Sequence, residues 1–137
     1  MKEIVFFKNK LIITVPDYYS YTSNEYYTLV LYTTEGKKYA IKFIVIDRNE
    51  NEKHNKLYKE IVNRKNVYKA YSDEKYFSVF NHSFDSENGK LNVTSFEIIF
   101  KNYYINIRWN DLEEMDSKNK KGFIEYIEKI INTIKEN

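Results

Sequence analysis

The sequence predicts a single α+β domain over residues 1–137: one antiparallel sheet of about seven or eight strands with two main helices, the C-terminal one packed on the sheet. Three observations predict this class. The chain has 137 residues, which is the size of one domain. Most of it alternates apolar and polar residues in short runs, as half-buried strands do. Two longer segments instead carry apolar residues at helical spacing.

The first third of the chain is predicted to form two β-hairpins. The apolar runs Glu3–Phe7 and Leu11–Val15 are separated by a short Lys-Asn-Lys turn, and Pro16 ends the second run because proline cannot donate to a ladder. Glu25–Thr33 has apolar residues on both of its faces, which is typical of a central strand. A turn then returns the chain into Lys38–Ile46, whose first half alternates as a half-buried strand should.

The rest of the chain is predicted to hold two helices around an antiparallel meander. The first helix is expected at about Glu52–Arg64, where one stripe contains His54, Leu57, Tyr58, Ile61 and Val62. The C-terminal helix carries a stripe of Phe123, Ile127, Ile130, Ile131 and Ile134. Between them three or four strands are expected, over Val67–Tyr71, Lys75–His82, Leu91–Phe100 and Tyr103–Trp109.

Besides this order of elements, two short segments of the sequence resemble those of a known family. In Ile13–Tyr19, a predicted strand ends at a proline, and two tyrosines follow shortly after it. In Gly122–Ile124, a phenylalanine lies near the start of the predicted last helix. At these positions the chain resembles the PsbP/DcrB-like group of small α/β sandwiches, in which tryptophan is usual where Tyr18 or Tyr19 stands. The resemblance implies the sandwich fold and a role as a binder, adaptor or chaperone. It supplies no catalytic residues.

Composition excludes several function classes. The chain has no cysteine, which removes disulfide scaffolds, thiolate zinc sites and cysteine nucleophiles. Its three glycines are far apart, so a glycine-rich phosphate loop is not expected. A net charge of +2 does not by itself indicate nucleic-acid binding. No apolar run is long enough for a signal peptide or a membrane span, so we expect a cytoplasmic protein without membrane contact.

Groups that could carry catalysis are few. His54 and His82 are far apart in the sequence, and we expect both to be structural. A nucleophilic site at His82 would lack the Gly-x-Ser-x-Gly turn. Glu113 and Glu114 follow Trp109, a setting that suits a carbohydrate-cleaving carboxylate pair. The acidic loops lack the glycine and final glutamate of a calcium loop. We therefore expect no catalytic residue, no metal and no cofactor, and a small hydrolase is the third alternative.

Tyrosine is the most unusual feature, with 14 in the chain. Several are adjacent, and adjacent residues of a strand point to opposite faces, so they cannot all share one core. Tyrosine is also enriched at interface hot spots. The predicted function is therefore non-catalytic protein binding by a monomer or homodimer, as a bacterial immunity or adaptor/chaperone protein whose partner is another protein such as a toxin or secreted effector. The candidate binding residues are Tyr18, Tyr19, Tyr21, Tyr103, Tyr104 and Arg108.

The abundance of tyrosine is also compatible with two roles besides protein binding. Strands favour aromatic residues, so the tyrosines could serve the fold alone. Lysines such as Lys42 and Lys69 lie among them, which also allows a single-strand nucleic-acid binder whose rings stack on bases. The near-neutral charge and the lack of glycine-flanked aromatic motifs argue against nucleic acid.

Overall fold

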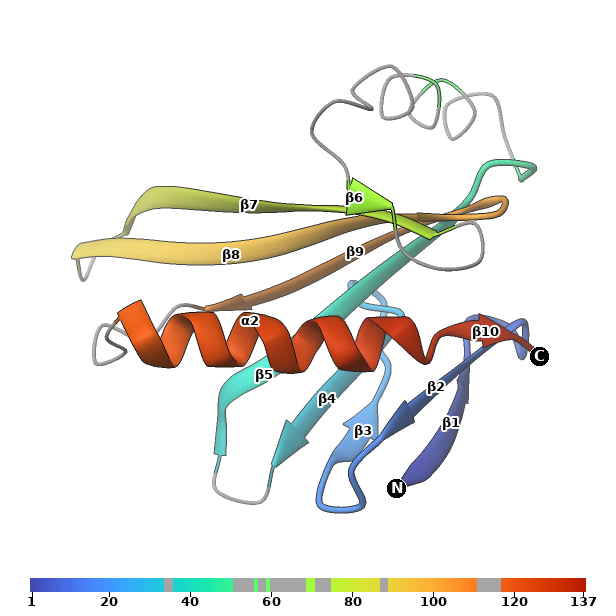
Figure 1. The fold of residues 1–137 in the computed structure, drawn as a ribbon, viewed down its shortest axis with the longest axis horizontal. Coiled ribbons are helices and arrows are strands. Elements are labelled where there is room, and N and C mark those ends of the chain that lie inside the picture. Colours follow the sequence, from blue (N-terminus) through green and yellow to red (C-terminus); the bar gives the residue numbers. More distant parts are fainter. Residues whose placement is uncertain are drawn as a thin grey trace.

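The computed structural model describes residues 1–33, 36–50, 56, 59, 69–70, 75–86, 89–110 and 117–137. Ten strands and the helix α2 lie within them (Figure 1). In chain order these are β1 (Lys2–Phe6), β2 (Leu11–Val15), β3 (Ser20–Thr22), β4 (Leu29–Thr33), β5 (Gly36–Asp47), β6 (Lys69–Ala70), β7 (Lys75–Ser86), β8 (Gly89–Phe100), β9 (Tyr103–Asn110), α2 (Ser117–Asn132) and β10 (Lys135–Glu136). No helix of these residues is long and apolar enough to cross a membrane.

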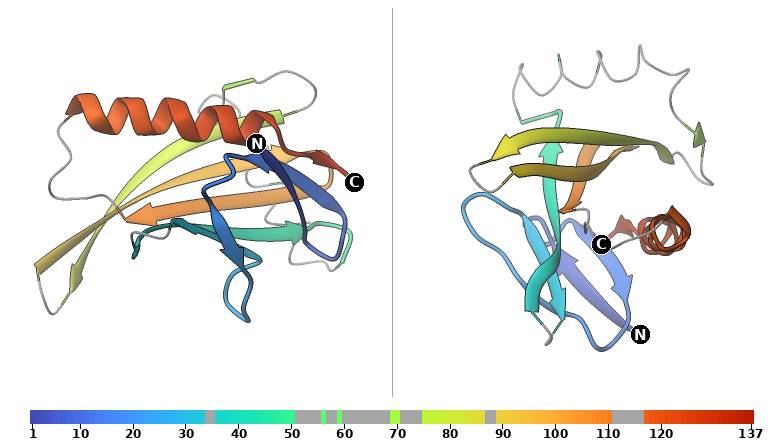
Figure 2. Two further views of the ribbon diagram at one scale, coloured as in Figure 1. Left: turned by 90° about the horizontal axis from the view of Figure 1, so that it is seen from below. Right: turned by 90° about the vertical axis from the view of Figure 1, so that its left-hand side faces the viewer.

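The strands divide between two antiparallel sheets. The larger has the order β3-β4-β5-β9-β8-β7-β6, and the smaller has the order β1-β2-β10. In Figure 1, α2 crosses in front of the larger sheet and leads into β10, which pairs with β2. The view from below in Figure 2 places α2 along one face of the larger sheet. The two ends of the chain therefore meet in the smaller sheet, on either side of β2.

The α+β class and the C-terminal helix are confirmed, but the single sheet predicted from the sequence is wrong. The residues after α2 turn into β10, and this strand joins the β1–β2 hairpin to make a second sheet. Two main helices are not supported either. Of the helix predicted at about Glu52–Arg64, only Lys56 and Lys59 are described; both are helical, and the remainder lies outside the described residues.

The core lies where α2 and the smaller sheet cover one face of the larger sheet. In the register of β5, β9 and β8, Phe43 and Phe96 flank Ile107, and all three are fully buried. Phe6 of β1 packs edge to face against Phe43, with ring centroids 6.1 Å apart. The helical stripe predicted from the sequence completes this core, and its described members are Ile127, Ile130, Ile131 and Ile134.

Strand β4 begins later than predicted because Asn24 builds a local turn. Its Oδ1 accepts hydrogen bonds from the backbone N–H groups of Tyr26 and Tyr27, both at 2.8 Å. Such side-chain bonds offer the backbone an alternative to a ladder. The strand consequently starts at Leu29 and not at Glu25.

Thr133 connects the end of α2 to β2. Its Oγ1 accepts a hydrogen bond from the N–H of Thr14 at 3.0 Å. The same hydroxyl can donate to the carbonyl oxygens of Ile130, at 2.6 Å, and of Thr14, at 3.2 Å. One side chain thus satisfies backbone groups at a helix end and at a strand, and it directs the chain into β10.

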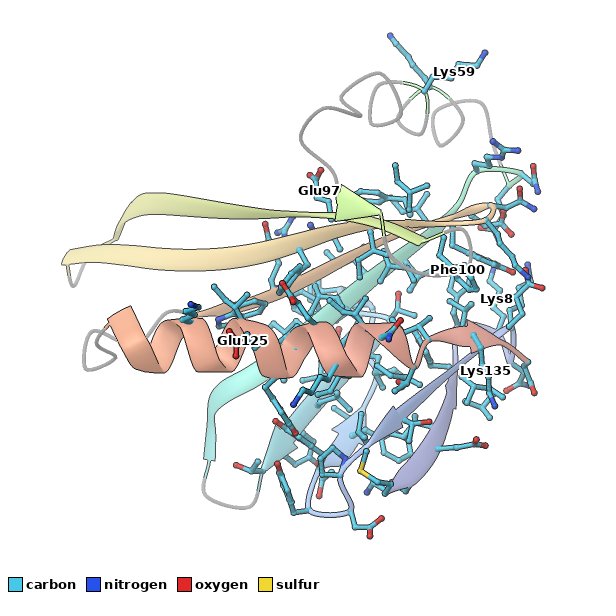
Figure 3. The ribbon with its side chains drawn as sticks, in the orientation of Figure 1. Lys8, Lys59, Glu97, Phe100, Glu125 and Lys135 are labelled. Carbon is cyan, nitrogen blue, oxygen red and sulfur yellow. The ribbon has the colours of Figure 1, made fainter. Side chains whose placement is uncertain are left out.

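Shortening Ile131 tests how much the helix contributes to stability. Ile131 has no exposed surface, so Ile131→Ala removes buried methyl groups and leaves a cavity. We expect the free energy of unfolding in urea to fall by about 2–5 kcal/mol. Glu125→Ala, on the exposed face of α2 (Figure 3), is the matched control and should change it by no more than about 0.5 kcal/mol. Equal effects of the two variants would contradict this packing.

Replacing the Thr133 hydroxyl tests the connection between helix and strand. Thr133→Val keeps the shape but leaves the N–H of Thr14 without its acceptor, so we expect a loss of about 1–3 kcal/mol in urea unfolding. Thr133→Ser retains the hydroxyl and should recover most of this loss. If the serine variant is as unstable as the valine variant, packing of the methyl group explains the effect and the hydrogen bonds do not.

Candidate protein-interaction surface

The candidate tyrosines that follow Pro16 differ in exposure. Tyr18 and Tyr21 expose 60% and 54% of their surface, whereas Tyr19 is buried in the core. The hydroxyls of Tyr18 and Tyr126 of α2 lie 3.0 Å apart, and the rings of Tyr18 and Tyr19 lie 5.0 Å apart. Burial raises the pKa of both Tyr19 and Tyr126. Tyr18 and Tyr21 are therefore available to a partner, while Tyr19 helps to hold the segment against α2.

The candidates on β9 lie on opposite faces of the larger sheet. Tyr103 is buried on the core face, where its ring packs at right angles to Phe7, with centroids 5.9 Å apart. Tyr104 and Arg108 are on the other face, since residues of even number share one side of this strand. The six candidates consequently do not form one surface.

On this second face, the side chains of Tyr104, Asn106 and Arg108 form a row of polar groups along β9. Asn106 is buried there; its amide donates to the hydroxyl of Tyr104 at 3.5 Å, and its Oδ1 accepts from Nε of the exposed Arg108 at 2.5 Å. Burial raises the pKa of Tyr104, and the nearby carboxylate of Glu97 raises it further. These bonds link the described side chains to one another along β9, and only Arg108 reaches solvent extensively.

Exposed apolar side chains gather near the N-terminus. Within the described residues the large exposed ones are Met1, Val5, Tyr18, Tyr21 and Tyr26. The Met1 amino group bonds to Asp17 at 3.0 Å, next to Tyr18, which brings the start of β1 to the tyrosine segment. We call Met1, Val5, Tyr18 and Tyr21 the N-terminal apolar patch. Val5 was not among the binding residues predicted from the sequence, although its place next to the buried Ile4 in a short strand gives it an outward position.

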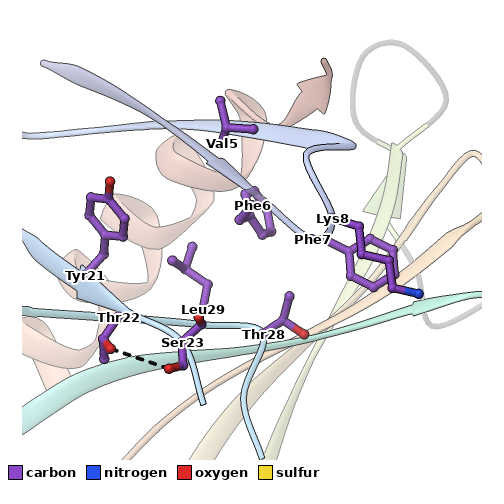
Figure 4. Close-up of a pocket in the computed structure, with 9 residues that line it drawn as sticks. All are labelled: Val5, Phe6, Phe7, Lys8, Tyr21, Thr22, Ser23, Thr28 and Leu29. Carbon is purple, nitrogen blue, oxygen red and sulfur yellow. Dashed lines mark hydrogen bonds between the residues drawn. The ribbon is translucent and has the colours of Figure 1, made fainter. Parts of the chain in front are cut away.

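A pocket of about 470 Å³ lies beside this patch. Figure 4 shows β1 and the following turn on one side and the β3–β4 region on the other. The lining residues are Val5, Phe6, Phe7, Lys8, Tyr21, Thr22, Ser23, Thr28 and Leu29. Their side chains are apolar, hydroxyl-bearing or, in Lys8, cationic, and include no carboxylate or imidazole. The described lining thus combines apolar side chains with a few hydroxyl groups and one cation.

The turn at the pocket rim carries both backbone strain and charge. Phe7, Lys8 and Asn9 all have positive φ values, of 53°, 54° and 62°, and the N–H of Lys10 closes the turn on the carbonyl of Phe7 at 3.0 Å. Lys8 forms an ion pair with Glu50 at 2.6 Å. Non-glycine residues rarely adopt such φ values, so the surrounding contacts must hold this turn in place.

Candidate groups for catalysis are mostly not described. His54, Glu113 and Glu114 lie outside the described residues, and His82 belongs to β7 with no described side chain. Among the described residues, no three histidine, aspartate or glutamate side chains come together as metal ligands.

Comparisons with known proteins show the fold alone. No protein-family model and no curated protein matches the chain. A crystal structure from Bacteroides thetaiotaomicron VPI-5482 is similar, with a TM-score of 0.64 and 7% identity over 99% of this chain and 48% of that one. This chain thus spans about half the length of the Bacteroides protein. The solution structure of cyanobacterial PsbP (CyanoP) from Synechocystis sp. PCC 6803 aligns over 99% of this chain and 92% of that one, with a TM-score of 0.47 and 5% identity. The Synechocystis protein is a member of the PsbP group that the sequence resembles; at this TM-score and identity it is a distant likeness of fold and no more.

The buried phenols predict a loss of stability at alkaline pH. Burial raises the pKa of Tyr19, Tyr104 and Tyr126, so these groups ionise more readily in the unfolded chain. Their contribution is complete below the unfolded pKa of about 10 and is lost as the pH rises above it. Urea midpoints at several pH values from about 8 to about 11.5 should fall with pH, and less steeply for Tyr126→Phe. Equal slopes for the two proteins would contradict the raised pKa of Tyr126.

Proposed function

We propose that this protein is a non-catalytic protein-binding domain whose partner docks on the N-terminal apolar patch and the adjoining pocket. The observation that carries the proposal is the exposure of Tyr21 and Val5, which line the same pocket, with the buried residues Phe6 and Leu29 in its wall. Exposed apolar side chains at the rim of a concave site are typical of interaction sites.

Physical contacts place Tyr21 of the patch against β1. Lys2 Nζ lies 5.8 Å from the ring centroid of Tyr21, and Val5 and Tyr21 line the same pocket. Tyrosine offers a large, rigid contact area with a polar tip and therefore loses little side-chain entropy on binding. Truncating such a residue at the centre of an interface commonly costs about 2 kcal/mol or more.

The more specific part of the proposal is the kind of partner. We place the protein among immunity or adaptor/chaperone proteins, whose partner is a toxin or a secreted effector. The chemistry of the pocket supports a binding role, because its described lining residues supply hydroxyls and a lysine but no pair of groups for acid–base or nucleophilic catalysis.

Single-strand nucleic-acid binding is the second candidate. Lys42 Nζ lies 5.0 Å from the ring centroid of Tyr27, and Lys42 pairs in register with Arg108 on β9. An aromatic ring with a cation over it, and a second cation on the neighbouring strand, is an arrangement that can stack a base and contact phosphates. A titration with labelled single-stranded DNA or RNA at several salt concentrations tests this candidate, which requires salt-dependent binding that Arg108→Ala weakens.

Tyr21→Ala tests the protein-binding proposal. A partner is first captured from native lysate with the tagged full chain, then identified, purified and titrated by calorimetry. We expect Tyr21→Ala to weaken its binding by about 30-fold, because the ring forms part of the patch and of the pocket wall. Arg108→Ala, an exposed side chain on the other face of the larger sheet, should leave the affinity within about twofold.

The opposite result would overturn the proposed surface: a loss with Arg108→Ala and none with Tyr21→Ala moves the interface to the other face of the sheet. Failure to capture any partner in stoichiometric amount would argue against protein binding altogether. The partner's own activity then separates the finer classes. An immunity protein inhibits a toxin in the purified complex, whereas an adaptor or chaperone leaves the activity of its partner intact after release.

A further inference from the structure

We propose that the free edge of β1 binds an extended peptide segment of the partner as an additional β-strand. The segment places an apolar side chain in the adjoining pocket and carries an acidic residue at the end that meets Lys2. This inference rests on the proposed protein-binding function and specifies which chemistry the surface recognises. It is carried by the direction of the β1 backbone, by the position of the pocket and by the charge of Lys2 at the start of the strand.

Within the described residues β1 pairs with β2 alone, which leaves its other edge free. In the smaller sheet β2 is central, with β1 on one side and β10 on the other. On the other side of the pocket, β3 is an edge strand of the larger sheet, and among the described strands its partner is β4. Edge strands present unpaired N–H and C=O groups that can pair with another chain.

Thr14 shows which way the backbone groups of β1 point. Its N–H and C=O both contact the Thr133 hydroxyl, at 3.0 and 3.2 Å, on the side of β2 away from β1. In an antiparallel pair, opposed residues alternate between those whose groups face the partner strand and those whose groups face away. Thr14 is opposite Glu3, and Ile12 is opposite Val5. The backbone groups of Glu3 and Val5 therefore point away from β2.

These groups have no backbone partner within the described part of the chain. The backbone bonds outside the ladders include none from Glu3 or Val5. Both residues also expose their side chains, so an incoming strand meets little steric hindrance there. Two residues with outward N–H and C=O groups offer up to four hydrogen bonds to an extended segment, spaced as in an ordinary antiparallel ladder.

The pocket lies where a side chain of the added strand would enter. Four consecutive residues, Val5 to Lys8, line it from β1 and its turn, and Tyr21 to Ser23 line it from the β3 side (Figure 4). Because side chains alternate along a strand, a segment paired with β1 directs every second residue to this side. Phe6, Phe7 and Leu29 favour an apolar or aromatic residue at that position.

Charge at the start of the edge favours an acidic flanking residue. There Lys2 lies over the Tyr21 ring and forms no ion pair with a described carboxylate. Beyond the other end, Lys8 already pairs with Glu50 at 2.6 Å and Lys10 with Asp47 at 3.3 Å, so that end adds no preference for an acid. Exposed lysines also discourage non-specific edge pairing, so a matching acidic segment gains selectivity.

Val5→Pro and Val5→Thr form the matched pair that tests this inference. Proline removes the outward N–H of Val5 but spares the bonds to β2, a position where edge strands tolerate proline. Threonine keeps the N–H and nearly the same shape. The probe is a library of ten-residue peptides displayed on phage and selected on the full chain, with recovered peptides resynthesised and titrated by fluorescence anisotropy. We expect alternating apolar sequences with an acidic residue at one end, about tenfold weaker binding to Val5→Pro, and binding within about threefold for Val5→Thr.

Amide hydrogen exchange gives a readout that needs no variant and therefore does not depend on Val5→Pro folding. In the free protein the amides of Ile4 and Phe6 should be protected by the β1–β2 ladder, and those of Glu3 and Val5 should exchange rapidly. Peptide binding should slow exchange at Glu3 and Val5 by at least about tenfold. Unchanged exchange at these two amides in the complex overturns the inference.

Further outcomes separate this inference from the proposed function. If Val5→Pro binds the peptides as wild type does, or if no peptide is recovered, strand addition is wrong. The protein-binding proposal then still stands if Tyr21→Ala weakens binding of the purified full-length partner. A wild-type dimer in sedimentation that becomes monomeric in Val5→Pro identifies a second copy of this chain as the occupant and also overturns the peptide proposal.

Discussion

The pairing of β2 on both of its edges is the constraint on which the rest of the described structure depends. On one side β2 bonds to β1 in a local hairpin, and on the other it bonds to β10 from the opposite end of the chain. The Thr133 hydroxyl reinforces this second contact at the point where α2 ends. Contacts between residues so distant in sequence are slow to form because the loop they close is long. Once made, they hold α2 over the larger sheet.

This constraint also decides which surface stays open. Strand β2 is covered on one edge by β10 and on the other by β1. Among the described strands of the smaller sheet, the free edge that borders the pocket is therefore the outer edge of β1. The buried face of the smaller sheet carries Ile4 and Phe6, so Glu3 and Val5 are directed outward by the strand period of two. The same pairing that completes the core thus leaves a strand edge, a pocket and exposed tyrosines next to one another.

The sequence allowed much of the local structure to be predicted. The runs over Leu91–Phe100 and Tyr103–Trp109 lie within β8 and β9, since alternation over about ten residues is a strong signal. The apolar stripe of α2 could be predicted equally well from its helical spacing. By contrast, β10 has two residues, too few for any periodicity, and it follows directly on the stripe that ends at Ile134. For the candidate site, Tyr18 and Tyr21 could be named from the sequence but not distinguished from Tyr19 and Tyr103, whose burial depends on contacts with remote segments.

The sequence by itself determined the α+β class, the hairpins, the C-terminal helix and the surplus of tyrosine beyond what one core face can hold. These features follow from local periods of about 2 and about 3.6 residues and from composition, which need no knowledge of distant partners. Only the tertiary structure decided that the strands form two sheets, which tyrosines are buried and which edge remains free. Those outcomes depend on pairings such as that of β10 with β2, between segments more than a hundred residues apart, and no local pattern encodes such a pairing.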